Sequence, residues 1–322
     1  MFPHRRPGPK AREAMSRSAE HLGEETCCRA SHKEINRCIK GIKDVVGQKF
    51  VKPVSSGNCA ILAAASAIPG KFMIPDQGGW RGFKDYPELM GREVCTLKTE
   101  LGVVSTDTLD GKLRKERPAA LFLTSFAGYI AEQNIREIFK ICRENSVILI
   151  EDASGGIGDR VLARGNSDIT ICSTGAPKIL NVFSGGFIST SEREILDMSM
   201  EVISACKVSP VTCAGIREEL KIAPKIVDTL LRYSKMLKEE LDGVIHRTRR
   251  GLGVGIRAAD PKNRVKSARE NGLVTDLNQG ILTACPRYDR FLETGVVVEL
   301  KKLDILKVTE DDIAKIAEIL KT

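Results

Sequence analysis

One lysine, Lys178, stands among small and apolar residues in the stretch STGAPKILNVFSGGFIST, residues 173–190. Lysine is seldom buried, because moving an ammonium group out of water is costly. Two further reactive groups end nearby apolar runs: Asp152 follows VILIE, and Ser173 follows ITIC. An amine with a carboxylate near it indicates imine or proton-transfer chemistry at the lysine.

A second reactive feature is the turn Ser55-Ser56-Gly57-Asn58, which leads into the alanine-rich run CAILAAASAI. That run predicts a buried helix, because alanine has the highest helix propensity and the run has no charges. The N-terminus of a helix binds phosphate through its free N–H groups and its dipole. We therefore predict a phosphate site at this turn.

Together these groups match the needs of pyridoxal 5′-phosphate. Its aldehyde forms an imine with a lysine amine, and a carboxylate keeps its ring nitrogen protonated. We assign Lys178 to the imine and Asp152 to the ring nitrogen. The turn at 55–58 and Ser173 are assigned to the phosphate, and Trp80 to the face of the ring. Desolvation is expected to lower the pKa of Lys178, and Gly185 with Gly186 to let backbone pass close to the cofactor.

The elements that must position these residues alternate between strands and helices. Apolar strands are predicted at 71–75, 119–125, 146–152, 168–173 and 186–190, with a helix at 132–145 and helical residues over 9–50. Continuous apolar strands between helices indicate an α/β fold with a mostly parallel sheet. Ligands of such sheets bind at the carboxyl ends of the strands, where Asp152 and Ser173 stand.

The pattern changes after about residue 210. A long helix is predicted over 215–248, followed by a strand entered from GLGVGIR, a helix near 262–271, and strands at 280–288 and 295–302. Thr309 is the expected N-cap of a final helix. We predict two domains: residues 1–210, an N-terminal helical segment with the large α/β domain, and residues 211–322, a small α+β domain.

Composition narrows the function classes. Ten scattered cysteines form no CxxC pair, which favours reduced thiols and no metal site. No apolar run is long enough to cross a bilayer and no secretory signal is visible, so we expect a cytoplasmic protein. The net charge of +8 is moderate, and the basic clusters at 246–250 and 262–269 are interpreted as solvated faces.

The order of the motifs resembles that of fold-type I pyridoxal-phosphate enzymes. EDASGGIG at 151–158 is similar to the EDAAQAxG segment of DegT/DnrJ-type sugar aminotransferases. The spacing from Ser173 to Lys178, the SGGFIST segment and the C-terminal GVVVELKKLDILKVTEDDIAKIAEIL also resemble that family. The resemblance covers most of residues 50–322, and it implies a homodimer with its active sites between two subunits.

Two positions bear on the substrate. Gly155 replaces the glutamine of the family, which lies near cofactor and substrate, so the resemblance leaves the substrate class open. Arg287, in CPRYDR, is the candidate for binding a substrate carboxylate, since arginine suits a bidentate grip.

Three functions follow. The first is an aminotransferase, in which Lys178 moves a proton between substrate and cofactor while an amino donor and a keto acceptor, such as a keto sugar, exchange an amino group. The second, on a looser resemblance, is an enzyme that builds cysteine or selenocysteine on a tRNA, with Cys27 and Cys28 carrying sulfur and the basic clusters contacting phosphates. The third is a cofactor-binding protein without catalysis. The absence of the family's glutamine is compatible with this function, since some members of large enzyme families lose their substrate-binding groups.

Overall fold

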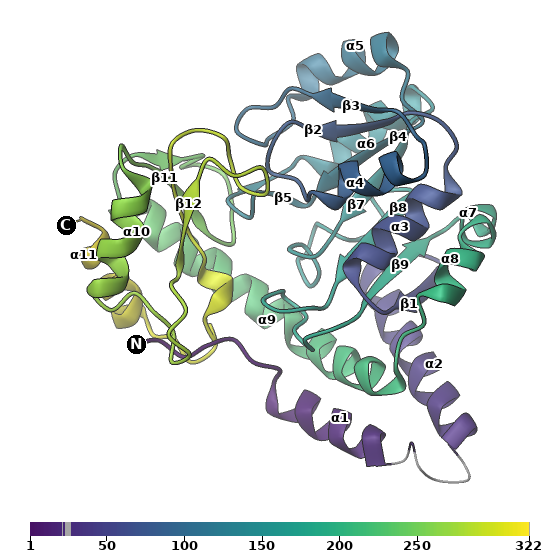
Figure 1. Ribbon diagram of the computed structural model, residues 1–322, viewed down its shortest axis with the longest axis horizontal. Helices are drawn as coiled ribbons and strands as arrows, with labels where there is room; N and C mark the ends of the chain where they lie inside the picture. The colour runs from purple at the N-terminus through teal and green to yellow at the C-terminus, as the bar shows by residue number, and fades with distance from the viewer. Residues whose placement is uncertain (21, 23–26, 322) are drawn as a thin grey trace.

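The protein forms two lobes joined by one long helix (Figure 1). The computed structural model describes residues 1–20, 22 and 27–321, and the side chains of residues 1–20, 22 and 32–321. A seven-stranded sheet with its helices makes up the larger lobe, and a four-stranded sheet makes up the smaller one. Helix α9 (Pro210–Glu240) runs between them.

The large sheet has the strand order β1-β9-β8-β7-β4-β2-β3. From β8 to β3 every neighbouring pair is parallel, whereas β9 runs antiparallel to both β8 and β1. This confirms the α/β fold with a mostly parallel sheet. The strands are β1 (Phe50–Val54), β2 (Phe72–Pro75), β3 (Val94–Leu97), β4 (Ala120–Thr124), β7 (Ile148–Asp152), β8 (Ile169–Ser173) and β9 (Gly186–Thr190).

Alternate side chains of each strand enter different cores, one on each face of the sheet. In β4, Phe122 packs with α3 and α4, while Leu121 and Leu123 pack on the side of α5, α6 and α9. Both faces are therefore dry, which is why the central strands read as continuous apolar runs. The helices of the larger lobe are α2 (Cys27–Val46), α3 (Gly57–Ala67), α4 (Gly82–Leu89), α5 (Thr106–Glu116), α6 (Ile135–Glu144), α7 (Arg193–Met198) and α8 (Met200–Ala205).

The two edge strands, β1 and β3, were not among the predicted strands. β1 contains Lys52 and Pro53, which are unusual inside a sheet, but an edge strand has one side without a partner and tolerates proline. β3 is short, and only Leu97 of its four residues is buried. Neither strand therefore has the apolar run on which the prediction depends.

The smaller lobe has an antiparallel sheet of order β10-β11-β13-β12. The predicted strand at 295–302 ends at Val298, and Leu300–Lys302 form the 3-10 helix η2. Thr309 caps the last helix as predicted, since its Oγ1 accepts from the backbone N of Asp312 at 3.2 Å. The remaining elements are β10 (Val244–Ile245), β11 (Val254–Arg257), α10 (Pro261–Glu270), β12 (Leu282–Cys285), β13 (Gly295–Val298) and α11 (Glu310–Lys321).

The N-terminal segment lies along the smaller lobe before helix α1 (Pro9–Glu20) packs on α9 (Figure 1). Phe2 forms a β-bridge with Thr275, and His4 forms one with Leu303. The division of the chain at residue 210 falls at the first residue of α9 and stays a prediction. Among the described residues, no helix is both long and apolar enough to span a bilayer.

Candidate active site

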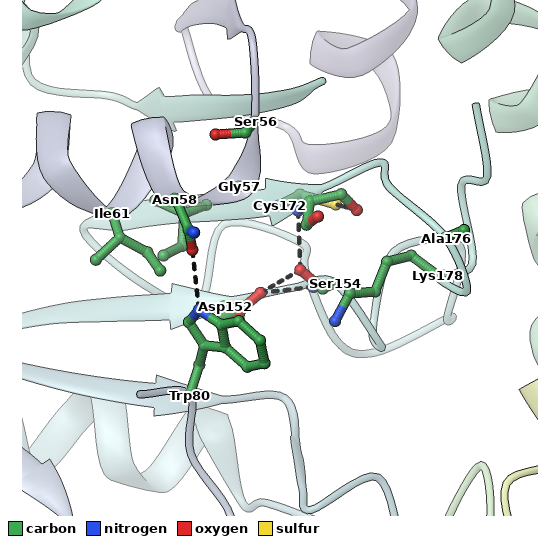
Figure 2. A pocket seen from close by; sticks show the side chains of 12 residues that line it. Ser56, Gly57, Asn58, Ile61, Trp80, Asp152, Ser154, Cys172, Ala176 and Lys178 are labelled. Carbon is green, nitrogen blue, oxygen red and sulfur yellow. Dashed lines mark hydrogen bonds between the residues drawn. The ribbon is translucent and has the colours of Figure 1, made fainter. Parts of the chain in front are cut away.

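Seven of the residues predicted to hold the cofactor line one cavity of about 210 Å³ at the carboxyl ends of β7 and β8 (Figure 2). They are Ser56, Gly57, Asn58, Trp80, Asp152, Ser173 and Lys178. Two predicted residues lie elsewhere. Ser55 does not line this cavity, and its Oγ is 3.2 Å from the Sγ of Cys59. Arg287 lines a neighbouring cavity of about 300 Å³ that also contains Lys178 and Asp152.

The carboxylate of Asp152 is held in place by a serine that the sequence analysis missed. Its Oδ1 accepts from both the backbone N and the Oγ of Ser154, at 2.9 and 2.5 Å. The Ser154 Oγ in turn accepts from the backbone N of Ser173 at 2.8 Å. These bonds, drawn in Figure 2, fix the direction of the Asp152 carboxylate relative to β8.

The start of helix α3 closes the cavity opposite Asp152. Ser56 is its N-cap, with Oγ accepting from the backbone N of Cys59 at 3.1 Å. Glycine is required next, because a Cβ on Gly57 would lie 2.5 Å from the Cβ of Ser173. The first N–H groups of α3 therefore reach the cavity, as a phosphate site requires.

The glycine pair serves this turn. Gly185 has φ of +85° and donates its N–H to Ser55 O at 2.9 Å. A Cβ on Gly186 would lie 2.5 Å from Cys172 O and 2.8 Å from Ser56 C. The pair therefore makes room for the 55–57 turn against β8. Its close approach to the cofactor stays a prediction.

Trp80 lines the cavity and is 40% exposed (Figure 2). Its Nε1 donates to Asn58 Oδ1 at 2.9 Å, and Lys178 Nζ is 5.5 Å from the centre of its ring. A hydrogen bond at its polar edge holds the indole while its face stays free, which suits packing against a planar ring.

The amine of Lys178 has a partner outside the predicted set. Its Nζ donates to the hydroxyl of Tyr129 at 2.7 Å. Burial lowers the pKa of Lys178, but the nearby Tyr129 and Asp152 outweigh it, so the pKa lies above its ordinary value. The expectation of a lowered pKa considered desolvation alone and omitted these two neighbours.

Tyr129 is the main residue that the sequence analysis missed. It stands in the turn between β5 (Phe126–Ala127) and β6 (Ala131–Glu132) with φ of +67°, a strained conformation for a bulky side chain. A Cβ on Gly155 would lie 3.2 Å from the Tyr129 ring. The tyrosine therefore takes the room beside Gly155, where the resembling family carries its glutamine. In the sequence, Gly155 in place of the glutamine and the adjacent Gly128-Tyr129 pair were the features that could have indicated a role for Tyr129.

The second cavity is lined by charged residues of the smaller lobe. Arg287 Nε is 3.0 Å from Asp289 Oδ1, and Arg290 bonds both Asp289 Oδ2 at 3.0 Å and Glu299 Oε1 at 2.6 Å. Burial raises the pKa of Glu299, but Lys301 and Arg290 bring it down to about 2. Glu299 therefore stays a carboxylate and keeps Arg290 in an ion pair.

The first cavity fits pyridoxal phosphate on four counts. It presents a helix N-terminus for a phosphate, an oriented carboxylate, a lysine amine and a free aromatic face. The four groups come from separate segments, β7, the 173–178 loop, the start of α3 and the loop at Trp80, yet they surround one space (Figure 2).

The arrangement of the strands and lobes is that of fold-type I pyridoxal-phosphate-dependent transferases. A serine palmitoyltransferase from Sphingomonas wittichii superposes with a TM-score of 0.76 at 14% identity, covering 98% of this chain and 83% of that one. A DegT DnrJ EryC1 StrS aminotransferase from Brucella abortus gives 0.74 at 15% identity, with 97% and 94% covered. An alanine–glyoxylate aminotransferase from Nostoc sp. gives 0.73 at 15%, with 100% and 95% covered.

Two family profiles match parts of the sequence. Residues 97–212 match the DegT/DnrJ/EryC1/StrS aminotransferase family, and residues 224–321 match the MJ1341 family C-terminal domain. Among curated proteins, no sequence matches this chain. The fold and the aminotransferase match together place the chain among the pyridoxal-phosphate-dependent transferases, as the resemblance implied.

Proposed function

We propose that this protein is an aminotransferase in which Lys178 carries pyridoxal phosphate. The observation that carries the proposal is the meeting of Lys178, Asp152 and the start of α3 at one cavity. The cofactor supplies an electron sink for the substrate carbon that loses its proton. Asp152 holds the proton on the ring nitrogen, and Ser56, Gly57 and Asn58 bind the phosphate.

Lys178 takes the substrate proton and returns it. When Lys178 is not bonded to the cofactor, its amine donates a hydrogen bond to the Tyr129 hydroxyl at 2.7 Å. This bond keeps the amine within the site. This contact gives Tyr129 a role in placing the base. The substrates are an amino donor and a keto acceptor, whose identities the fold leaves open.

The tRNA-linked and non-catalytic functions stay as alternatives. Cys27 and Cys28 have side chains outside the described residues. In the basic cluster at 246–250, the Arg247 guanidinium bonds Lys238 O and Leu241 O, and Arg250 pairs with Glu132 and Asp159. These internal bonds leave fewer cations for a polyanion. For the non-catalytic function, Tyr129 offers a physical reason for the missing glutamine that does not require lost activity.

We further propose a cytoplasmic homodimer. Phe183, in the loop that follows Lys178, is a large apolar residue that is 61% exposed in the single chain. A second subunit covering this loop would bury it. Sedimentation of the purified protein, with Phe183→Asp as the dissociating variant, tests the assembly.

Visible absorption of protein given pyridoxal phosphate tests the function. We expect a band that borohydride reduction fixes onto Lys178, as peptide mapping would locate, and that Lys178→Ala lacks. Lys307→Ala, a matched change at an exposed lysine, should keep the band. An amino donor should then convert the band in the wild type. A label on another lysine would end the assignment of Lys178, and a band without conversion by any donor would favour the non-catalytic alternative.

A further inference from the structure

The second cavity contains a row of alternating charges that ends at a lysine. Arg287, Asp289, Arg290, Glu299 and Lys301 follow one another in ion-pair contact. The inner members are matched on both sides, since Arg290 lies between two carboxylates and Glu299 between two cations. Lys301 is the inner end of the row, and it faces the same cavity as Lys178.

Lys301 is buried without the partners that a buried ammonium needs. The residue is 7% exposed, yet its Nζ makes no hydrogen bond to any residue that the structure describes. Its polar neighbour is Glu299 Oε2 at 3.5 Å, and its nitrogen lies 3.1 Å from the centre of the Tyr129 ring. An ammonium has three donors. The donors of Lys301 are therefore unused at the wall of the second cavity.

We propose that Lys301 is the anchor for an oxyanion group of the substrate, a carboxylate or a phosphate. This inference rests on the proposed function, because it concerns the substrate of the same site. The alternative anchor is Arg287, the residue expected from the sequence. Its side chain is 55% exposed and already paired with Asp289, so an anion gains less from it than from a desolvated amine.

An anion bound at Lys301 should change the pKa of this amine. Burial lowers the pKa of Lys301 well below its ordinary range; among its charged neighbours, Glu299 and Asp289 oppose this effect while Arg290 and Lys178 add to it. An oxyanion placed at the amine supplies the missing counter-charge and stabilises the ammonium form. Anion binding should therefore raise the pKa of Lys301, and any neutral fraction of the amine would take up a proton.

The test measures anion binding to the holoenzyme by titration calorimetry, with inorganic phosphate and with succinate as probes. Each titration is repeated in two buffers that differ in ionisation enthalpy, which reports protons taken up. Lys301→Met should weaken the tighter-binding probe at least tenfold and abolish the buffer dependence. Lys301→Arg should restore binding without proton uptake. Lys307→Met is the matched control at an exposed lysine and should bind as the wild type does.

The competing outcomes are distinct. Tighter binding of phosphate than of succinate assigns a phosphorylated substrate, and the reverse assigns a carboxylate. Equal binding by wild type and Lys301→Met, loss of binding in Arg287→Gln alone, or no binding of either probe to the wild type overturns the proposal. The cofactor band is read on every sample, so a failure of the anion site with the band intact is separate from a failure of the proposed function.

Discussion

Two buried lysines of this protein, Lys238 and Lys301, are 3% and 7% exposed and differ in what surrounds the amine. Lys238 Nζ donates to three backbone carbonyls, those of Ile130, His246 and Arg249, at 2.9, 3.0 and 2.7 Å. Lys301 has no such acceptor among the described residues and faces a cavity instead. Both lysines are therefore buried, but only the N–H donors of Lys238 have hydrogen-bond acceptors among the described residues.

The difference indicates what each amine is for. All three donors of Lys238 are used to tie the end of α9 to the turn after β5 and to the 246–249 segment, which is a structural role. Burial lowers the pKa of Lys238 only to about 8, so it stays charged at neutral pH. Lys301 has one carboxylate at 3.5 Å and an aromatic ring beside it, but no hydrogen-bond acceptor among the described residues. Unused donors at a cavity wall are expected of a residue that meets a ligand.

The largest effect should come from a third lysine, whose partner is a hydroxyl. Lys178→Met removes the amine that carries the cofactor and moves the substrate proton, so we expect the rate of the amino-donor half-reaction to fall by about 10³-fold or more. The fall is measured by stopped-flow absorbance on protein loaded with cofactor. An unchanged rate would show that another group moves the proton.

Lys238→Met should produce the largest loss of stability. It removes the donor that serves three carbonyls, of which only His246 O keeps another donor among the described residues, the backbone N of Arg249 at 3.1 Å. We expect the free energy of unfolding to fall by about 3 kcal/mol. Urea denaturation followed by circular dichroism measures the fall. The cofactor band of the folded fraction should keep its position. A loss below about 1 kcal/mol would mean that water replaces the amine, and the contrast with Lys301 would fail.

The sequence predicts the chemistry of one cavity better than that of the other. Asp152 ends β7 and Lys178 lies in the loop that follows β8, so their meeting follows from the rule for parallel sheets. Tyr129 and Lys301 depend on tertiary details that no periodicity shows. Tyr129 reaches Lys178 only because its backbone enters the left-handed region. From the sequence, Lys301 is expected at the polar end of a strand. In the structure it lies in the 3-10 helix η2, which directs the chain at this point.

The elements of the fold also divide into those that the sequence predicts and those that depend on tertiary contacts. Central strands were predictable because both of their faces are buried, so their sequences are continuously apolar. The edge strands β1 and β3 lack that pattern, and their pairing is decided by their neighbours β9 and β2. The caps were predictable where a local hydrogen bond defines them, as at Thr309.

A buried carboxyl next to the site extends the comparison to acids. Glu151 is fully buried; its Oε1 accepts from Ser125 Oγ at 2.6 Å and Ala163 N at 3.1 Å, while Oε2 has no partner among the described residues. Burial raises the pKa of Glu151 to about 7. The folded protein then holds this proton more tightly than the unfolded chain, so the stability that Glu151 contributes is greatest below about pH 4.5 and is lost as the pH rises through about 7.

For Glu151 we therefore expect the free energy of unfolding to fall by roughly 2 to 3 kcal/mol as the pH rises from about 4.5 to about 7, and to change little from this group above that. Glu151→Gln cannot ionise and should remove this slope. Urea unfolding of both proteins at several pH values measures it. Parallel curves for the two proteins would show that the carboxyl ionises in the fold without cost.

The smallest effect on stability should come from Lys301→Met, the counterpart of Lys238→Met. The methionine stem still covers the Tyr129 ring, and Glu299 keeps Arg290 as its partner at 2.6 Å. Since no hydrogen bond is lost and a desolvated amine is removed, we expect the free energy of unfolding to change by less than about 1 kcal/mol, or to rise. The same urea measurement on holoenzyme decides it. A loss as large as that of Lys238→Met would make Lys301 structural, and satisfied donors would no longer separate the two lysines.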